Sequence, residues 1–94
     1  MIRWGIVGTG MMAIEHIANL MLTPGSVVTA LVDPEPASIA RARAAVGGDV
    51  RVFESPAALA ASGTVDAVLV ASPNFTHHDV LQPLLDARLN ILCE

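Results

Sequence analysis

The sequence predicts an α/β fold in which a five-stranded parallel sheet carries helices on both faces. Five short apolar runs alternate with four stretches of helical character along the 94 residues. This alternation is typical of repeated βαβ units. A glycine-rich turn follows the first apolar run, where doubly wound sheets commonly have one. Hydrophobic residues make up 53 % of the chain but aromatic residues only 3 %, so we expect an aliphatic core.

The first two strands and the helix between them have clear boundaries. Ile2–Val7 is the first predicted strand, and a helix follows from about residue 11 to residue 22. Thr23-Pro24-Gly25 ends this helix, because proline cannot continue a helix and glycine tolerates left-handed angles. Residues 27–32 form the second strand, which ends at Asp33-Pro34.

The middle of the chain contains two helices around a short strand. A second helix is predicted over Pro36–Val46, ended by Gly47-Gly48, and Arg51–Phe53 forms the third strand. A third, short helix begins at Ser55-Pro56, with serine as N-cap and proline at the first helical position. It ends at Ser62-Gly63.

The last part of the chain holds the most apolar strand, over residues 65–71, which suits burial on both faces. A loop follows at 72–74. Thr76, with an acid three residues later, resembles a capping box and begins a helix that ends at about residue 87. Residues 89–93 form the fifth strand. Because crossovers between parallel strands are right-handed, we predict a Rossmann-type doubly wound sheet of order 3-2-1-4-5.

The clearest motif is the stretch IVGTGMMA, which has the pattern G-x-G-x-x-A between a strand and a helix. Gly8 permits the tight turn, and Gly10 lacks a Cβ, so that a pyrophosphate can approach the backbone. Ala13 is small enough for close contact between helix and strand. The free amides of Met11 and Met12 lie at the positive end of the helix dipole, where an anion is favoured.

An acid follows this turn at the spacing expected of a dinucleotide site. Asp33 lies 23 residues after Gly10, at the end of the second strand, where a carboxylate can bond the adenosine ribose hydroxyls. The alternative is two turn glycines and a surface acid, which the register of strand, helix and acid disfavours. Asp33 and nearby Glu35 would repel a 2′-phosphate, and no arginine directly follows. We therefore predict NAD as the cofactor, with NADP less favoured.

The whole chain resembles the N-terminal domain of the glucose-fructose oxidoreductase, inositol dehydrogenase and MocA family. Three motifs carry the resemblance, in order: GIVGTGMMA, ASPNFTHH and NILCE. The family pattern for the second motif is matched by Ser72, Pro73, Asn74 and His77. The third family pattern is a strand followed by Glu-Lys-Pro, in which Glu94 matches the glutamate.

The resemblance implies a set of cofactor-binding residues. The first group surrounds the pyrophosphate and adenosine ribose, and the second lies near the nicotinamide: Gly8, Gly10, Met11, Met12 and Asp33, then Ser72, Pro73, Asn74, His77 and Glu94. An alternative for His77 is a solvent-facing residue at the start of a helix, where the dipole disfavours a positive imidazole.

By the same resemblance, the parent protein is an NAD(P)-dependent oxidoreductase acting on CH–OH groups. It would transfer a hydride between nicotinamide and a sugar- or polyol-like alcohol. In the family a lysine follows the glutamate at position 94 and acts as an acid/base or orienting group, but this chain has no lysine. We therefore expect residues 1–94 to be an NAD(P)-binding Rossmann domain, truncated before the family's C-terminal α/β substrate domain. It would have no catalytic residue of its own, and alone it would only bind cofactor.

Composition excludes several other partners. The net charge is −4 with no basic run, which argues against nucleic acid and anionic membranes. No apolar run reaches the roughly 18 residues of a membrane span. The single cysteine, Cys93, allows no intrachain disulfide and no cysteine-cluster metal site, and it fits a reducing cytoplasm. We expect contacts between copies through the exposed edge of the fifth strand.

Two other functions remain open from the sequence. The first is a nucleotide-binding or regulatory module without catalysis, which the missing lysine favours. The second is a methyltransferase-like domain, because glycine-rich turns followed by an acid also hold adenosyl ligands. The stretch SPNFTHH argues against the second.

Overall fold

The computed structural model describes residues 1–9, 11–33, 35–47, 49–71, 77–87 and 89–93, and within these the side chains of residues 11, 12, 77–81 and 93 are not described. Strands and helices alternate, as the sequence predicts. In chain order the elements are β1 (Ile2–Val7), α1 (Met11–Leu22), β2 (Ser26–Val32), α2 (Pro36–Val46), β3 (Arg51–Phe53), α3 (Pro56–Ser62), β4 (Ala67–Val70), α4 (His77–Asp86) and β5 (Asn90–Cys93).

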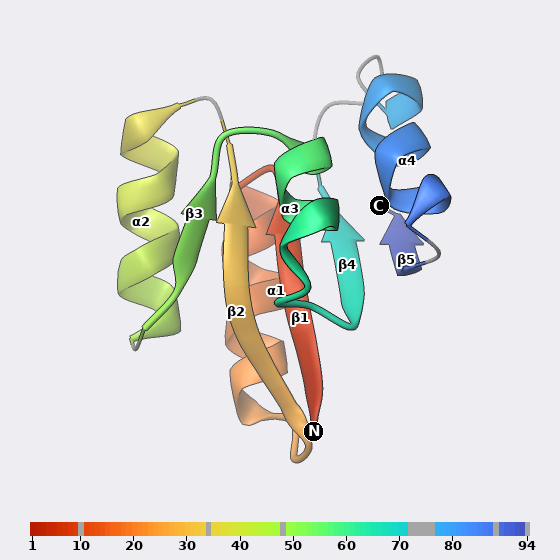
Figure 1. Cartoon of the computed structure of the whole chain (residues 1–94). Helices are drawn as coiled ribbons and strands as arrows, with labels where there is room; N and C mark the ends of the chain where they lie inside the picture. The colour runs from red at the N-terminus through yellow and green to blue at the C-terminus, as the bar shows by residue number, and fades with distance from the viewer. Residues whose placement is uncertain (10, 34, 48, 72–76, 88, 94) are drawn as a thin grey trace.

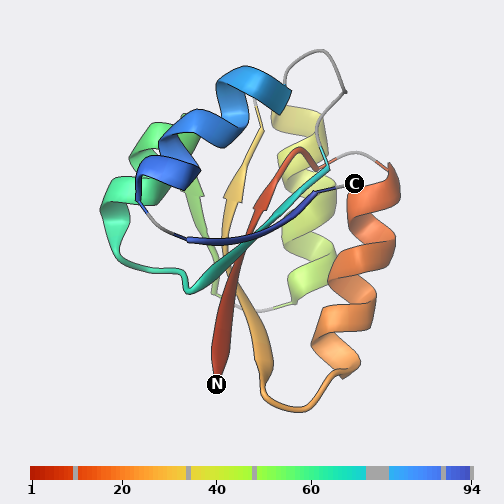
Figure 2. The same cartoon turned by 90° about the vertical axis from the view of Figure 1, so that its right-hand side faces the viewer.

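The strands form one parallel sheet in the order β3-β2-β1-β4-β5. This confirms the predicted Rossmann order. Figures 1 and 2 show three layers, with α1 and α2 on one face of the sheet and α3 and α4 on the other. Since all strands run the same way, their carboxyl ends meet at one edge, at the top of Figure 1.

The core lies on both faces of the sheet, because successive residues of a buried strand point to opposite sides. Ile6, Leu31 and Leu69 pack with Ala13 and Ile17 of α1 on one face. The residues next to them on the same strands, together with Leu59 and Leu84, form the core beneath α3 and α4: Val7, Val32, Val68 and Val70. The core is aliphatic, as composition predicts.

Helix ends follow local chemistry. Ser55 caps α3, and its hydroxyl accepts a hydrogen bond from the Ala58 amide at 3.1 Å. Gly47 ends α2 in the left-handed conformation, with φ of 71°. Glu35 caps the start of α2 by accepting from the Ala37 amide, a role that the sequence analysis did not assign. Pro83 lies inside α4.

Predicted strand boundaries needed small corrections. β4 begins at Ala67 and ends at Val70, which is shorter than the predicted 65–71. Asp66 lies before this strand and is held by Arg3, since its amide donates to the Arg3 carbonyl at 2.7 Å and its carboxylate binds the guanidinium. β2 begins one residue earlier than predicted, at Ser26, and β5 one residue later, at Asn90.

The middle of β1 is tightly enclosed. A Cβ added to Gly5 would lie 3.1 Å from both Leu59 Cδ2 and Val65 Cγ1. The register between β1 and β2 also shifts between Trp4 and Gly5, which leaves Thr29 of β2 without a partner in the ladder. The Thr29 hydroxyl donates instead to the Thr64 carbonyl at 3.0 Å.

Candidate functional site

The glycine turn leaves the carboxyl end of β1 as predicted. Gly8 has φ of 86°, a left-handed conformation that favours glycine. Its amide donates to the Val32 carbonyl at 2.8 Å, which continues the contact between β1 and β2 past the end of the strand. Thr9 is fully buried, and its amide donates to Asp33 Oδ2 at 2.7 Å. The turn and the predicted ribose acid are therefore in direct contact.

Asp33 uses both carboxylate oxygens at this edge. Oδ2 accepts from the Thr9 amide, and Oδ1 accepts from the Glu35 amide at 2.8 Å. The Asp33 side chain is half-buried, so it is held in place and still reaches solvent. Glu35 is exposed beside it and caps α2. These two carboxylates make the end of β2 negative, which disfavours a phosphate group at the same place.

The start of α1 has the opposite polarity. The helix is 12 residues long, and its first turn contains no acidic side chain. Its leading amides lack partners within the helix and carry the positive end of the dipole. Ala13 is fully buried against the sheet, as expected for a small residue at this position of the motif. An anion is favoured next to the helix start, and a hydroxyl donor next to Asp33.

Several predicted site residues cannot be compared with the structure. Gly10, the 72–74 loop with Ser72, Pro73 and Asn74, and Glu94 lie outside the described residues. Met11 and Met12 open α1, and His77 opens α4, but their side chains are not described. The amide of Ala71 donates to the Val7 carbonyl at 2.8 Å, which brings the root of the β4 loop beside the glycine turn. The roles of these residues stay predictions.

Two features at this edge were missed by the sequence analysis. The Thr9 hydroxyl is buried and has no hydrogen-bond partner among the described residues. The bond from the Thr9 amide to Asp33 joins residues 24 positions apart. No sequence signal could identify it, because every residue except proline offers the same amide.

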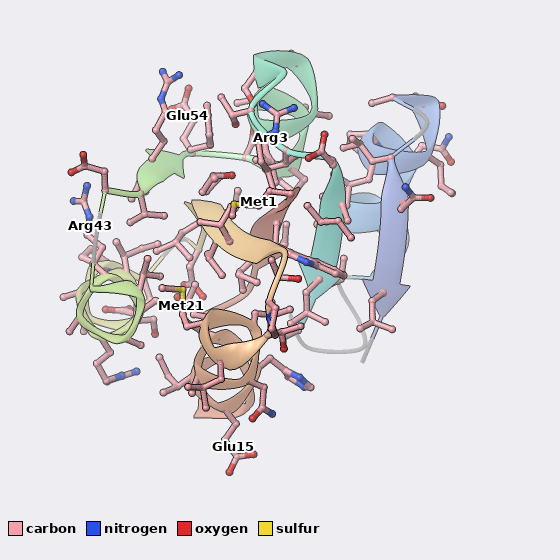
Figure 3. All side chains as sticks on the ribbon, turned by 90° about the horizontal axis from the view of Figure 1, so that it is seen from below. Met1, Arg3, Glu15, Met21, Arg43 and Glu54 are labelled. Carbon is pink, nitrogen blue, oxygen red and sulfur yellow. The ribbon has the colours of Figure 1, made fainter. Side chains whose placement is uncertain are left out.

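A separate cavity of about 410 Å³ lies at the other, amino-terminal edge of the sheet. Its lining residues are Arg3, Thr29, Arg43, Asp49, Val50, Arg51 and Thr64. Figure 3 views this edge from below, with Arg3 beside α3 and Arg43 on α2. Each arginine there already has a partner: Arg3 binds Asp66, Arg43 donates to the Val50 carbonyl, and Arg51 lies over the Phe53 ring. Because its lining residues lie at the amino-terminal edge, the cavity is distinct from the site at the carboxyl edge.

Among the residues that the structure describes, no group of three or more His, Cys, Asp or Glu side chains could hold a metal ion. No helix in the described ranges combines the length and the apolar character needed to cross a membrane.

Comparison with known proteins gives one consistent family. A family model described as an oxidoreductase family with an NAD-binding Rossmann fold matches residues 2–94. An inositol 2-dehydrogenase of Corynebacterium glutamicum (strain R) is 39 % identical over 94 residues, covering 99 % of this chain and 28 % of that protein. An inositol 2-dehydrogenase of Paenarthrobacter aurescens (strain TC1) is 38 % identical, with 99 % and 27 % covered.

Solved structures agree with the sequence relatives. The myo-inositol dehydrogenase of Lactobacillus casei, in complex with NAD(H) and myo-inositol, matches with a TM-score of 0.92 and 26 % identity, covering 99 % of this chain and 28 % of that one. KijD10, a 3-ketoreductase of Actinomadura kijaniata in complex with TDP-benzene and NADP, matches with a TM-score of 0.83 and 29 % identity, covering 98 % and 29 %. This chain thus spans just over a quarter of the length of these proteins.

Proposed function

This chain belongs to the glucose-fructose oxidoreductase, inositol dehydrogenase and MocA family as an NAD-binding Rossmann domain, and on that premise we propose that it holds NAD across the carboxyl edge of its sheet. One observation carries the proposal: the Asp33 carboxylate is held against the glycine turn. The acceptor for ribose hydroxyls and the loop for the diphosphate therefore lie side by side.

The described residues fit a dinucleotide. The left-handed Gly8 turns the chain toward the start of α1, whose first turn has no acid to compete with a diphosphate. Each oxygen of a carboxylate has about two acceptor positions, so Asp33 keeps free acceptor positions beyond its two backbone bonds. The buried Thr9 hydroxyl, without a described partner, adds a polar group at the same place.

We propose the following binding roles for this chain. Gly8, Gly10, Met11 and Met12 surround the diphosphate and Asp33 the adenosine ribose, whereas Ser72, Pro73, Asn74, His77 and Glu94 lie toward the nicotinamide. NAD supplies the hydride acceptor when bound, and the residues of this chain bind and orient it. No residue of this chain is proposed as catalytic.

NAD is proposed over NADP on electrostatic grounds. In the proposed binding mode a 2′-phosphate would approach the half-buried Asp33 and the exposed Glu35, whose amide donates to Asp33. Bringing a phosphate to two carboxylates is unfavourable. The arginines that follow in the chain, Arg41 and Arg43, are on α2, where they donate to Ser38 and to the Val50 carbonyl. KijD10 is in complex with NADP and the Lactobacillus casei enzyme with NAD(H), so related folds hold either cofactor.

The parent activity that we propose is oxidation of a sugar- or polyol-like alcohol, supported by the inositol dehydrogenases among the relatives. Residues 1–94 alone should bind cofactor without turnover. Hydride transfer needs an alcohol held beside the nicotinamide and a group that takes its proton, and this chain contains no lysine. Its single cysteine fits a reducing cytoplasm, which we propose as its location.

Calorimetric titration tests the cofactor. Purified 1–94 should bind NADH more tightly than NADPH, and S-adenosylmethionine should not compete. A Glu15→Gln variant removes an acid on the exposed side of α1 (Figure 3) and controls for the loss of one negative charge. It should keep the preference for NADH over NADPH. Equal or tighter binding of NADPH would contradict the role of Asp33.

The second candidate is a nucleotide-binding or regulatory module without catalysis, since the contact of Asp33 with the glycine turn requires only nucleotide binding. The two candidates differ in the parent protein and not in the binding step. Reduction of NAD by purified 1–94 with a panel of sugars and inositols would contradict our expectation for this domain.

A further inference from the structure

We propose that Asp33 is also a positioning residue, which holds the glycine turn in its binding conformation before any cofactor arrives. This inference rests on the proposed function, since it concerns how the same site prepares for NAD. The carboxylate would then serve two parts of the cofactor. It would accept the ribose hydroxyls directly, and it would set the diphosphate loop through Thr9.

The geometry of the carboxylate supports this second role. Its Oδ2 accepts from the Thr9 amide at 2.7 Å and its Oδ1 from the Glu35 amide at 2.8 Å. Two backbone donors, one on each oxygen, restrict rotation of the carboxylate. Hydrogen bonds to an ionised acceptor are shorter and stronger than neutral ones. The side chain therefore links the glycine turn to the start of α2.

Hydrogen bonds between the β1 and β2 segments continue past the last residues of both strands. The Gly8 amide still reaches a backbone acceptor, the Val32 carbonyl, at 2.8 Å. At the next residue the Asp33 side chain replaces the backbone as acceptor for Thr9. Two successive amides of the turn are thus attached to the end of β2, on either side of the left-handed bend at Gly8.

Thr9 depends on this bond more than an exposed residue would. It is fully buried, and its hydroxyl has no partner among the described residues. Burying a backbone amide without an acceptor costs free energy. Removal of the carboxylate would therefore favour movement of the turn. The helix amides proposed to face the diphosphate follow Thr9 closely in the chain, so they would move with it.

This coupling has a consequence for cofactor specificity. Replacing Asp33 with a small residue removes the repulsion of a 2′-phosphate but also releases the turn. Such a variant should therefore lose affinity for NADH without gaining a comparable affinity for NADPH. If Asp33 contacted only the ribose, its replacement would reverse or abolish the preference for NADH over NADPH. Binding of the diphosphate would then stay unchanged.

Binding of ADP and 2′,3′-dideoxy-ADP separates the two roles, because the second ligand has no ribose hydroxyls for Asp33 to bind. Asp33→Asn keeps the shape of the side chain but offers one acceptor oxygen in place of two. We expect it to weaken both ligands, and dideoxy-ADP by about tenfold or more, as for one hydrogen bond to a charged group. Glu35→Gln is the control, since it removes the neighbouring charge and leaves the acceptor of Thr9 in place. Unchanged dideoxy-ADP affinity in Asp33→Ala, which offers no acceptor oxygen to Thr9, would overturn the proposal.

Amide hydrogen exchange in the free protein gives a readout that needs no ligand. Exchange at Thr9 should accelerate in Asp33→Asn and Asp33→Ala relative to Glu35→Gln, at matched global stability from urea unfolding. If Asp33→Ala does not fold, the Asp33→Asn comparison decides. Unaltered exchange at Thr9 overturns the positioning role. If the unmodified protein binds no adenine nucleotide, the proposed function fails, while the exchange result still decides whether Asp33 holds the turn.

Discussion

At the residue scale, two aspartates at strand ends stabilise opposite edges of the sheet. Asp33, at the carboxyl edge, accepts hydrogen bonds from two backbone amides. Asp66, at the amino edge, binds Arg3 through the Arg3 amide at 2.9 Å and through the guanidinium at 3.0 and 3.1 Å. The Arg3–Asp66 pair joins the start of β1 to the start of β4, 63 residues later.

The Arg3–Asp66 pair predicts a pH dependence of stability. Hydrogen bonds from the Arg3 side chain, and then from its backbone, lower the pKa of Asp66 from 3.8 to about 2. A lowered pKa in the folded state means that the contribution is complete above the unfolded value, near pH 4, and is lost as the pH falls toward 2. The side chains are 45 % and 43 % exposed, so solvent screens the pair and the effect should be small.

Urea unfolding between pH 2 and pH 5 measures this effect. Asp66→Asn should lower the urea midpoint at pH 5 but should converge with the unmodified protein at pH 2. Glu15→Gln, on the exposed side of α1, removes an acid that is far from Arg3 and is the matched control. A constant difference across the pH range would show that the charge of Asp66 is not the cause.

At the element scale, helix stability and anion binding have opposite requirements at the start of α1. An acid in the first turn of a helix stabilises it through the dipole, yet α1 has no acid there. α2 and α3 also have no acid in the first turn, but Glu35 caps α2 and Ser55 caps α3. The start of α1 therefore carries no negative side chain that would oppose an anionic ligand.

We therefore predict opposite effects of Met12→Glu on stability and binding. The added carboxylate should raise the free energy of unfolding by about 0.3–1 kcal/mol through the helix dipole. It should weaken NADH binding, because it repels the diphosphate. Urea unfolding and calorimetry measure the two effects, and Met12→Gln controls for the change in side-chain shape. Unchanged NADH affinity in Met12→Glu would mean that the diphosphate lies elsewhere.

At the scale of the whole molecule, helices cover both faces of the sheet, but apolar side chains stay exposed near the β5 edge. α1 and α2 lie over one face and α3 and α4 over the other (Figure 2). β5 is at the edge and pairs with β4. Leu92 of β5 is 55 % exposed and Leu85 of α4 is 58 % exposed, so apolar surface remains open beside a strand edge. Such edges favour contact with another chain.

We predict that purified 1–94 associates with itself through this edge. Leu92→Glu should shift the protein toward monomer in sedimentation velocity, because a charge on an edge strand opposes pairing. Leu22→Glu is the control, since Leu22 is 82 % exposed but lies at the end of α1, away from β5. Association that is equal in both variants would place the contact on another surface.

Much of the fold could be predicted because its signals are local. Glycine and proline at helix ends, Ser55 as a cap and the alternation of apolar runs act within a few residues of the chain. Together with the handedness of crossovers, they sufficed for the order of the strands, which the structure confirms. The predicted strand ends were less accurate: β4 starts at Ala67 and not at residue 65, and the carboxylate of Asp66 just before it accepts from the Arg3 amide and guanidinium.

Sequence alone determined the class of fold, the glycine turn, its acid and the family resemblance, since each depends on residue type and spacing. Only the tertiary structure decided which atoms meet: Thr9 with Asp33, 24 residues apart, and Gly5 against Leu59 and Val65. The physical reason is that these contacts depend on the register and packing of parallel strands that are distant in the chain. The sequence does not indicate which group a backbone amide or a glycine will contact. The positioning role of Asp33 could therefore be inferred only from the structure, in which the ends of β1 and β2 lie together.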